Sequence, residues 1–174
     1  MAFNIYISEP MSKIKIRRIA NDFRKLLGIE ETKYVEVVKY LDEMIKYDPM
    51  YDYEIVEDCE MGPSKQADID VINHKITIKQ SVYDGACNGN KTDRMTIAHE
   101  LGHFVLVCIL GIRFAKNLDK RGYVETFRDP EWQATVFASE FLAPISLITN
   151  TSPKNISNEY GITERAAKSQ LRHI

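Results

Sequence analysis

The sequence is poor in cysteine and tryptophan, with 3 Cys and 1 Trp among its 174 residues. The cysteines, Cys59, Cys87 and Cys108, are odd in number and form no Cys-x-x-Cys pair. This pattern argues against a disulfide framework and against a cysteine-based zinc knuckle. We therefore expect the protein to work in a reducing compartment, the cytoplasm.

Neither sign of charge dominates, and no long hydrophobic run is present. The formal net charge is −2, so we expect no strong attraction to nucleic acid or to anionic membranes. The longest apolar run, residues 104–112, is far shorter than the roughly 20 residues that span a bilayer. The first ten residues, MAFNIYISEP, lack the basic start and the apolar stretch of a secretory signal. A hydrophobic fraction of 44% is typical of one globular domain.

Hydrophobic spacing predicts an α+β fold with a small mixed or antiparallel sheet. We expect residues 1–150 to form one domain and residues 151–174 to form a short helical tail packed on it. His74 is expected in a turn. Cys87 is expected in a polar loop over residues 84–91, where it could be an extra metal ligand, although a lone loop cysteine usually has no such role. The expected elements are helices over 12–27 and 33–47, a sheet over about 53–80 with a hairpin of 69–72 and 75–79, a helix over 92–110 capped by Thr92 or Asp93, a helix over 130–143, and two short helices after 152.

The most informative motif is His99-Glu100-Leu101-Gly102-His103. Residues four apart lie on one face of a helix, so both imidazoles can reach a single metal ion. Glu100 follows the first histidine, and this position suits a general base beside the ion. Apolar neighbours bury the helix, where ionisable groups without partners would be costly. The alternative is a pair of hydrogen-bonded core histidines that bind no metal.

A third ligand is expected from a later segment, because catalytic zinc usually has three protein ligands and one open position. No histidine follows His103 until His173, so a carboxylate is the better candidate. Glu131 and Glu140 both lie on the helix predicted after Pro130. Weaker candidates are Asp119, Glu125 and Asp129.

Two blocks of sequence resemble a known family. Residues 96–103, TIAHELGH, resemble the T-I/L-A-H-E-L-G-H block of the ImmA/IrrE family of metallo-endopeptidases. Residues 131–144, EWQATVFASEFLAP, resemble that family's E-x-Q-A-N-x-F-A-x-x-L-L-M-P block, whose first glutamate is the third zinc ligand and falls on Glu131. Two departures, Thr135 for Asn and Ala143 for Met, are not expected to touch a ligand. The resemblance covers roughly residues 68–172, including the helical tail.

This resemblance implies a zincin-like core and a zinc endopeptidase with a glutamate as third ligand. One Zn²⁺ ion would be held by His99, His103 and Glu131. Members of the family are bacterial, cytoplasmic and often encoded by prophages, and they typically act on a helix-turn-helix repressor. We expect Glu100 to take a proton from the attacking water and to pass it to the leaving amine. Tyr123 is one candidate for stabilising the oxyanion.

Two other functions stay open at this stage. The tail has roughly the spacing of a helix-turn-helix, which would bind DNA. Its net charge of +2 is weak for a phosphate-binding surface, so a packing role is favoured; the charged residues are Lys154, Arg165, Lys168 and Arg172 against Glu159 and Glu164. The other possibility is a non-catalytic, zinc-containing protein that binds a regulator, as an antitoxin or antirepressor does.

Overall fold

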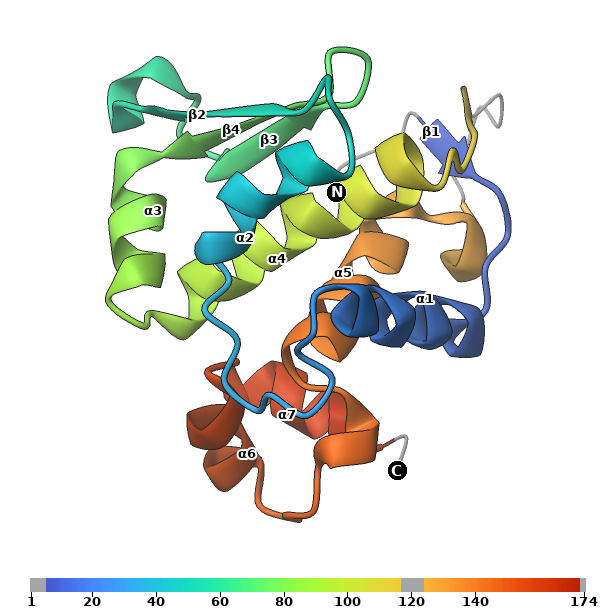
Figure 1. Ribbon diagram of the computed structural model, residues 1–174, viewed down its shortest axis with the longest axis vertical. Helices are drawn as coiled ribbons and strands as arrows, with labels where there is room; N and C mark the ends of the chain where they lie inside the picture. The colour runs from blue at the N-terminus through green and yellow to red at the C-terminus, as the bar shows by residue number, and fades with distance from the viewer. Residues whose placement is uncertain (1–5, 117–123, 173–174) are drawn as a thin grey trace.

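The computed structural model describes residues 6–116 and 124–172, and it confirms the α+β class (Figure 1). The α-helices in these residues are α1 (Lys13–Leu26), α2 (Lys39–Glu43), α3 (Gln80–Cys87), α4 (Lys91–His103), α5 (Pro130–Leu142), α6 (Pro153–Tyr160) and α7 (Glu164–Leu171). The strands are β1 (Tyr6–Ser8), β2 (Asp52–Val56), β3 (Ala67–Asp70), β4 (Lys75–Lys79) and β5 (Phe114–Lys116).

The larger sheet has the strand order β2-β4-β3 and is mixed, because β4 pairs parallel with β2 and antiparallel with β3. The hairpin of β3 and β4 lies where the alternating pattern predicts it. His74 sits in the turn with φ 55 and bonds to Asp48 through its ring, so its predicted turn position is confirmed. A separate pair of strands, β1 and β5, is antiparallel and was not predicted.

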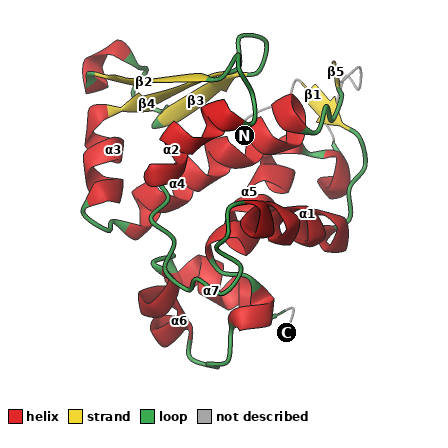
Figure 2. Ribbon diagram, in the orientation of Figure 1, coloured by secondary structure: helices red, strands yellow, loops and turns green. Residues whose placement is uncertain are grey.

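Helix α4 lies between the sheet and α5, and α5 in turn packs against α1 (Figure 2). The core that these elements share is aromatic and aliphatic. Its fully buried members include Ile76 of β4, Leu101 of α4, and Phe137 and Phe141 of α5. This burial removes apolar surface from water and holds α4 in the middle of the molecule.

Helices α1 and α5 begin and end close to their predicted limits because local capping signals agree with the hydrophobic pattern. The Ser12 side chain accepts a hydrogen bond from the Lys15 amide at the start of α1. Asp129 caps α5 by accepting from the Glu131 amide, and Pro130 occupies the first turn. Both arrangements satisfy amides that a helix start leaves unpaired.

The helix predicted over residues 33–47 is wrong over its first half. Only α2 is α-helical, followed by a 3-10 turn over Met44–Lys46. Before it, Val35 and Val37 are buried and Glu36 between them is exposed, a spacing of two. A buried arginine from another element holds this irregular segment, because Arg94 donates to the Val35 carbonyl at 2.8 Å. Arg24, also buried, donates to the Ile29 carbonyl at 2.7 Å and holds the turn that follows α1. The long-range hydrogen bond of Arg94 outweighs local helix propensity.

The polar loop predicted over residues 84–91 is also wrong, because α3 continues through Cys87. Gly85 lies within α3. A Cβ at this position would lie 2.0 Å from Oδ2 of Asp93, so the lack of a side chain lets α3 pack against α4. The cap of α4 is Asn90, and not Thr92 or Asp93. Its side chain accepts hydrogen bonds from the amides of both residues. Residues 88–90 are all that separates the two helices.

The helix predicted over residues 92–110 changes character at its middle. Helix α4 ends at His103, and a π-helix follows over Phe104–Ile109. The wider turn begins directly after the second histidine of the motif, and such turns often accompany functional sites. Gly111, with φ 65, ends the segment where a left-handed residue was expected.

Helices α6 and α7 share the hydrophobic core with the rest of the chain. Ile156 and Tyr160 of α6 and Ala167 of α7 are fully buried in it. The Tyr160 hydroxyl donates to the Leu147 carbonyl at 2.6 Å. The tail is thereby tied to the end of α5.

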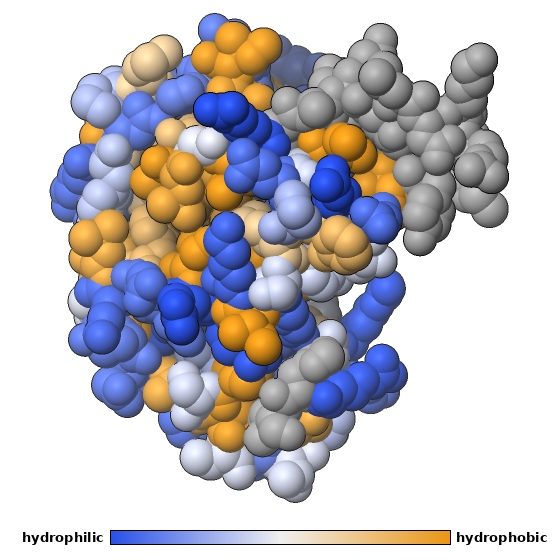
Figure 3. All heavy atoms as spheres, turned by 90° about the vertical axis from the view of Figure 1, so that its right-hand side faces the viewer, coloured by the Kyte–Doolittle hydropathy of each residue, from blue (hydrophilic) through white to orange (hydrophobic). Residues whose placement is uncertain are grey.

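Within the described residues, no helix has both the length and the apolar character needed to cross a bilayer. On the face drawn in Figure 3, hydrophobic side chains form separate patches among hydrophilic ones. This distribution is ordinary for a folded chain.

Arg94 should be a large contributor to stability. Its guanidinium is buried, donates to the Gly161 carbonyl at 2.9 Å as well as to Val35, and lies 4.0 Å from the centre of the Tyr34 ring. Arg94→Ala would leave these buried carbonyls unpaired, so we expect a loss of about 2–4 kcal/mol in the free energy of unfolding. Urea unfolding measures it. The exposed Arg18→Ala should change stability by no more than about 0.5 kcal/mol, and an equal effect in the two variants would contradict the role of Arg94.

Candidate metal centre

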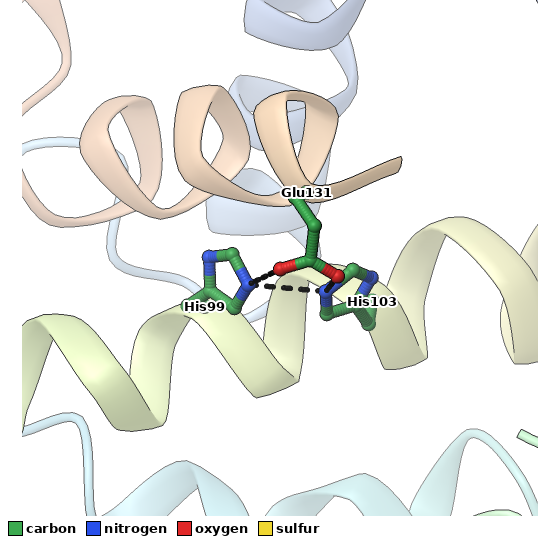
Figure 4. Close-up of side chains that lie close together, drawn as sticks. All are labelled: His99, His103 and Glu131. Atoms are coloured by element: carbon green, nitrogen blue, oxygen red, sulfur yellow. Dashed lines mark hydrogen bonds and ion pairs between the residues drawn. The ribbon is translucent and has the colours of Figure 1, made fainter. Parts of the chain in front are cut away.

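Three side chains from two helices meet at one point (Figure 4). His99 and His103 project from α4 one turn apart, and Glu131 reaches them from the first turn of α5. The two Nε2 atoms are 3.0 Å apart, and the Glu131 oxygens lie 3.1 Å from Nε2 of His99 and 3.3 Å from Nε2 of His103. The structure therefore brings together the ligand set expected from the sequence.

These distances fit a tetrahedral metal site. With bonds of roughly 2.0–2.1 Å to zinc, two ligand atoms of a tetrahedron stand about 3.3 Å apart. Hydrogen bonding alone accounts for the arrangement less well, because each Nε2 carries at most one hydrogen and faces both the carboxylate and the other ring. A shared cation satisfies all three atoms at once. In the described part of the chain, this is the group of His, Cys, Asp and Glu side chains close enough to hold an ion.

Gly102 sets the distance between the two helices that carry the ligands. A Cβ at this position would lie 3.0 Å from the Ala134 carbonyl oxygen and 3.1 Å from Cδ1 of Phe137. Both contacts are on α5, so a glycine on this side of α4 allows the close approach that Glu131 needs.

Thr135 contacts a ligand, which corrects the expectation that it touches none. Its Oγ1 lies 3.3 Å from Nδ1 of His99, the ring nitrogen that faces away from Glu131. Metal-binding histidines usually donate this second N–H to an oxygen, which fixes the tautomer and the ring orientation. Thr135 lies one helical turn after Glu131, so a single face of α5 supplies both the carboxylate and the hydroxyl. Ala143, the other departure, is buried beyond the end of α5.

Glu100 is buried but lines a hollow of about 720 Å³, together with the candidate ligands His103 and Glu131. The hollow is lined by β3 and the turn after it, and by Glu100, His103 and Glu131. Glu100 is adjacent to the ligand group without belonging to it. A carboxylate in this position can exchange a proton with a molecule that occupies the hollow.

The charges at the site shift the pKa values of its groups in opposite directions. The imidazoles of His103 and His99 hold the pKa of Glu131 well below its usual range. Burial opposes protonation of His99, but the hydrogen bond to Glu131 together with the charges of Glu100, Glu131 and Asp129 outweighs burial and raises the pKa of His99. Burial also raises the pKa of Glu100, against the effect of the two histidines. Glu131 is therefore the ionised member and Glu100 the stronger base.

The other candidates from the sequence lie elsewhere. Glu140 is fully buried and pairs with Arg17 at 3.0 Å, while Asp129 caps α5. Glu125 pairs with Arg128 at 3.5 Å. Cys87 is exposed at the end of α3 and is not part of the ligand group. Asp119 and Tyr123 fall outside the described residues.

Sequence reasoning left the positioning groups of the site unnamed. Gly102 lies between the two histidines in the first block that carries the resemblance. Thr135 lies one helical turn after Glu131 in the second block. That spacing was the available signal, and it indicated which positions face the metal helix without showing what they contact.

Gly102→Ala tests the close helix packing. The added methyl should push α5 away from α4, so we expect zinc affinity to fall about tenfold, in the range known for positioning groups. Stability should change little, because the helix propensity of alanine offsets part of the crowding. Competition with a chromophoric chelator measures the affinity. Gly62→Ala, at a position with open space, is the matched control; equal affinities in all three proteins would contradict this role of Gly102.

The pKa of His99 gives a second test. In the metal-free protein, Glu131→Gln should lower this pKa, because it removes the contact that raises it. NMR titration of the imidazole ring protons measures the change, and Glu125→Gln should leave the value unaltered. Zinc affinity of the unmodified chain should rise with pH and level off above the pKa of His99, since the ligand must lose its proton. An unchanged His99 pKa in Glu131→Gln would rule out the contact.

Comparison with known proteins adds no family assignment. No family model matches this chain, and no curated protein is significantly similar to it.

Proposed function

We propose that the protein is a zinc-dependent endopeptidase with a zincin-like core. The observation that carries the proposal is the triangle of His99, His103 and Glu131 with the Glu100 carboxylate beside it. Three ligands leave one position of a tetrahedron open, which is typical of catalytic rather than structural zinc sites. The resemblance of residues 96–103 and 131–144 to a metallo-endopeptidase family supports the same reaction.

The residues of the chain divide the work of peptide hydrolysis. A bound Zn²⁺ ion supplies Lewis-acid chemistry, which lowers the pKa of water toward about 7 and polarises a carbonyl. Glu100 accepts a proton from the attacking water as the water oxygen bonds to the carbonyl carbon. Glu100 then delivers the proton to the amide nitrogen as the C–N bond breaks. Thr135 keeps the His99 ring in place through Nδ1.

The shape around the site supports a polypeptide substrate. Strand β3 is at the edge of the sheet, and no described strand pairs with its outer side. The same strand lines the hollow that contains Glu100 and Glu131. An extended peptide can add to such an edge through backbone hydrogen bonds. Ile72, 82% exposed at the end of this hollow, offers an apolar contact.

We further propose that the substrate is a helix-turn-helix repressor, as the resemblance implies. The non-catalytic alternative, a zinc-containing protein that binds such a regulator, predicts a stable complex without cleavage. Both forms of the proposal require the metal site, so zinc content alone does not separate them.

Glu100→Gln separates the two. We expect this variant to retain zinc and to lose hydrolysis by about 10²–10⁴-fold, because the proton acceptor is gone and the ligands remain. His99→Ala should lose both zinc and hydrolysis. The measurements are zinc content by atomic emission and cleavage of a helix-turn-helix regulator, with and without a chelator.

Glu125→Gln is the matched control, and it should keep both zinc and cleavage. Hydrolysis at the unmodified rate by Glu100→Gln would exclude the assigned role of Glu100. A zinc-loaded, uncut complex of the unmodified chain with the regulator would favour the binding protein.

A further inference from the structure

A second hollow adjoins the ligand group at His99 and shares no lining residue with the hollow beside β3. It begins beside His99 as a space of about 270 Å³ and continues into a larger one of about 690 Å³. Met95, Thr135 and Thr163 line both spaces, so they form one groove. This groove runs from the proposed reaction centre along α5 to α7. The hollow beside β3 touches the same ligand group at His103 and Glu131.

Buried hydrogen bonds fix the far wall of the groove. Gln170 of α7 is fully buried, and its amide donates to the carbonyls of Ala143 at 2.8 Å and Ser139 at 3.3 Å. These bonds tie α7 to α5. Thr163 caps α7 by accepting from the Ala166 amide at 3.2 Å. The groove is therefore part of the folded structure rather than a gap between loosely packed segments.

The lining of the larger space combines an apolar floor with two cations. Met95, Trp132 and Val136 supply apolar surface, and Lys13 and Arg165 supply positive charge. No described carboxylate lines this space. The hollow on the β3 side has the opposite character, because its lining includes Asp68, Asp70, Glu100 and Glu131.

Neither cation of the groove is neutralised by an ion pair in the described residues. Glu140 is the acidic group whose charge raises the pKa of Lys13. Glu140 is fully buried, however, and pairs with Arg17. Burial lowers the pKa of Lys13, so its ammonium is partly stripped of water. A cation in this state gains more from an incoming carboxylate than a fully solvated one does.

We propose that this groove is a substrate subsite that binds an acidic side chain of the polypeptide between Lys13 and Arg165. The inference rests on the proposed peptidase function and deepens it. The acidic hollow beside β3 and the basic groove beside α7 give the two sides of the cleft opposite charge. A substrate with a carboxylate on one side of the scissile bond would therefore bind in a single direction.

Trp132 makes the subsite directly measurable, because it is the single tryptophan of the chain and lines the groove. The probes are two pools of tryptophan-free octapeptides, acetylated and amidated, identical except that Asp and Glu in one are Asn and Gln in the other. Binding to the zinc-loaded protein is followed by Trp132 fluorescence. Mass spectrometry of the same mixtures records cleavage. Constant zinc keeps Glu131, the neighbour of Trp132, in one state.

We expect the acidic pool to bind about tenfold more tightly than the amide pool, and the preference to weaken with salt. Arg165→Glu should abolish the preference. Lys168→Glu makes the same charge change on α7 at a position that does not line the groove, and it should preserve the preference. Lys13→Gln, on α1, should also reduce the preference. This variant leaves α7 unaltered, so it tests the subsite even if Arg165→Glu fails to fold.

Equal binding of the two pools, or equal loss of preference in Arg165→Glu and Lys168→Glu, would overturn the subsite. Displacement of the acidic pool by random duplex DNA at equal phosphate charge would assign the groove to nucleic acid instead. Acidic preference in binding without any cleavage would support the subsite while contradicting the peptidase. Cleavage without an acidic preference would support the peptidase while contradicting the subsite.

Discussion

Glu131 meets His99 and His103 because α5 packs directly on α4 at Gly102, and the rest of the site depends on that contact. Two histidines one turn apart are common on helices, and they bind a catalytic ion usefully only with a third ligand. That ligand must come from another element, so the interhelical distance decides whether a site exists. Gly102 lies between the histidines and faces Ala134, where any side chain would meet a carbonyl oxygen at 3.0 Å. The motif thus contains its own spacing device.

The same contact determines how the site is oriented. Because α5 approaches along its own first turns, Glu131 and Thr135 both reach His99, one at each ring nitrogen. The ring is held from two sides by a single helix face. Burial of Glu100 then follows from the position of α4 under the sheet, with its carboxylate left toward the hollow beside β3. Glu100, the three candidate ligands and the edge strand β3 are consequently arranged by the packing of α4 between the sheet and α5.

The sequence predicted best those elements whose local signals agree with their packing. Helix α5 has a cap, a proline in its first turn and an apolar stripe, and it begins at the predicted residue. The failures lie where distant groups decide. Residues 33–38 were predicted to be helical, yet Arg94 donates to the Val35 carbonyl and holds this segment outside a helix. Gly85 looked like a loop residue because nothing in the sequence shows that Asp93 packs against it.

The ligands themselves were accessible from residue types and spacing, with Glu131 selected over Glu140 by the family resemblance. The structure gives the physical reason for that choice. Glu140 lies two and a half turns after Glu131 on α5, where it faces α1 and pairs with Arg17. Groups that act through another side chain were less accessible. A threonine at position 135 is unremarkable in sequence, and only its place opposite Nδ1 gives it a role.

The proposed subsite gives the helical tail a role in substrate binding, which its weak positive charge alone did not suggest. Without α7, the groove beside His99 would be an open side of α5, since Thr163, Arg165 and Gln170 supply one of its walls. In the peptidase proposed here, selectivity would come from the surfaces that guide the substrate to the metal site. Here α7 contributes charge to one side of the centre and β3 contributes the opposite charge to the other. On this proposal, α7 packs through the fully buried Ala167 and Gln170 and presents the exposed Arg165 to the groove.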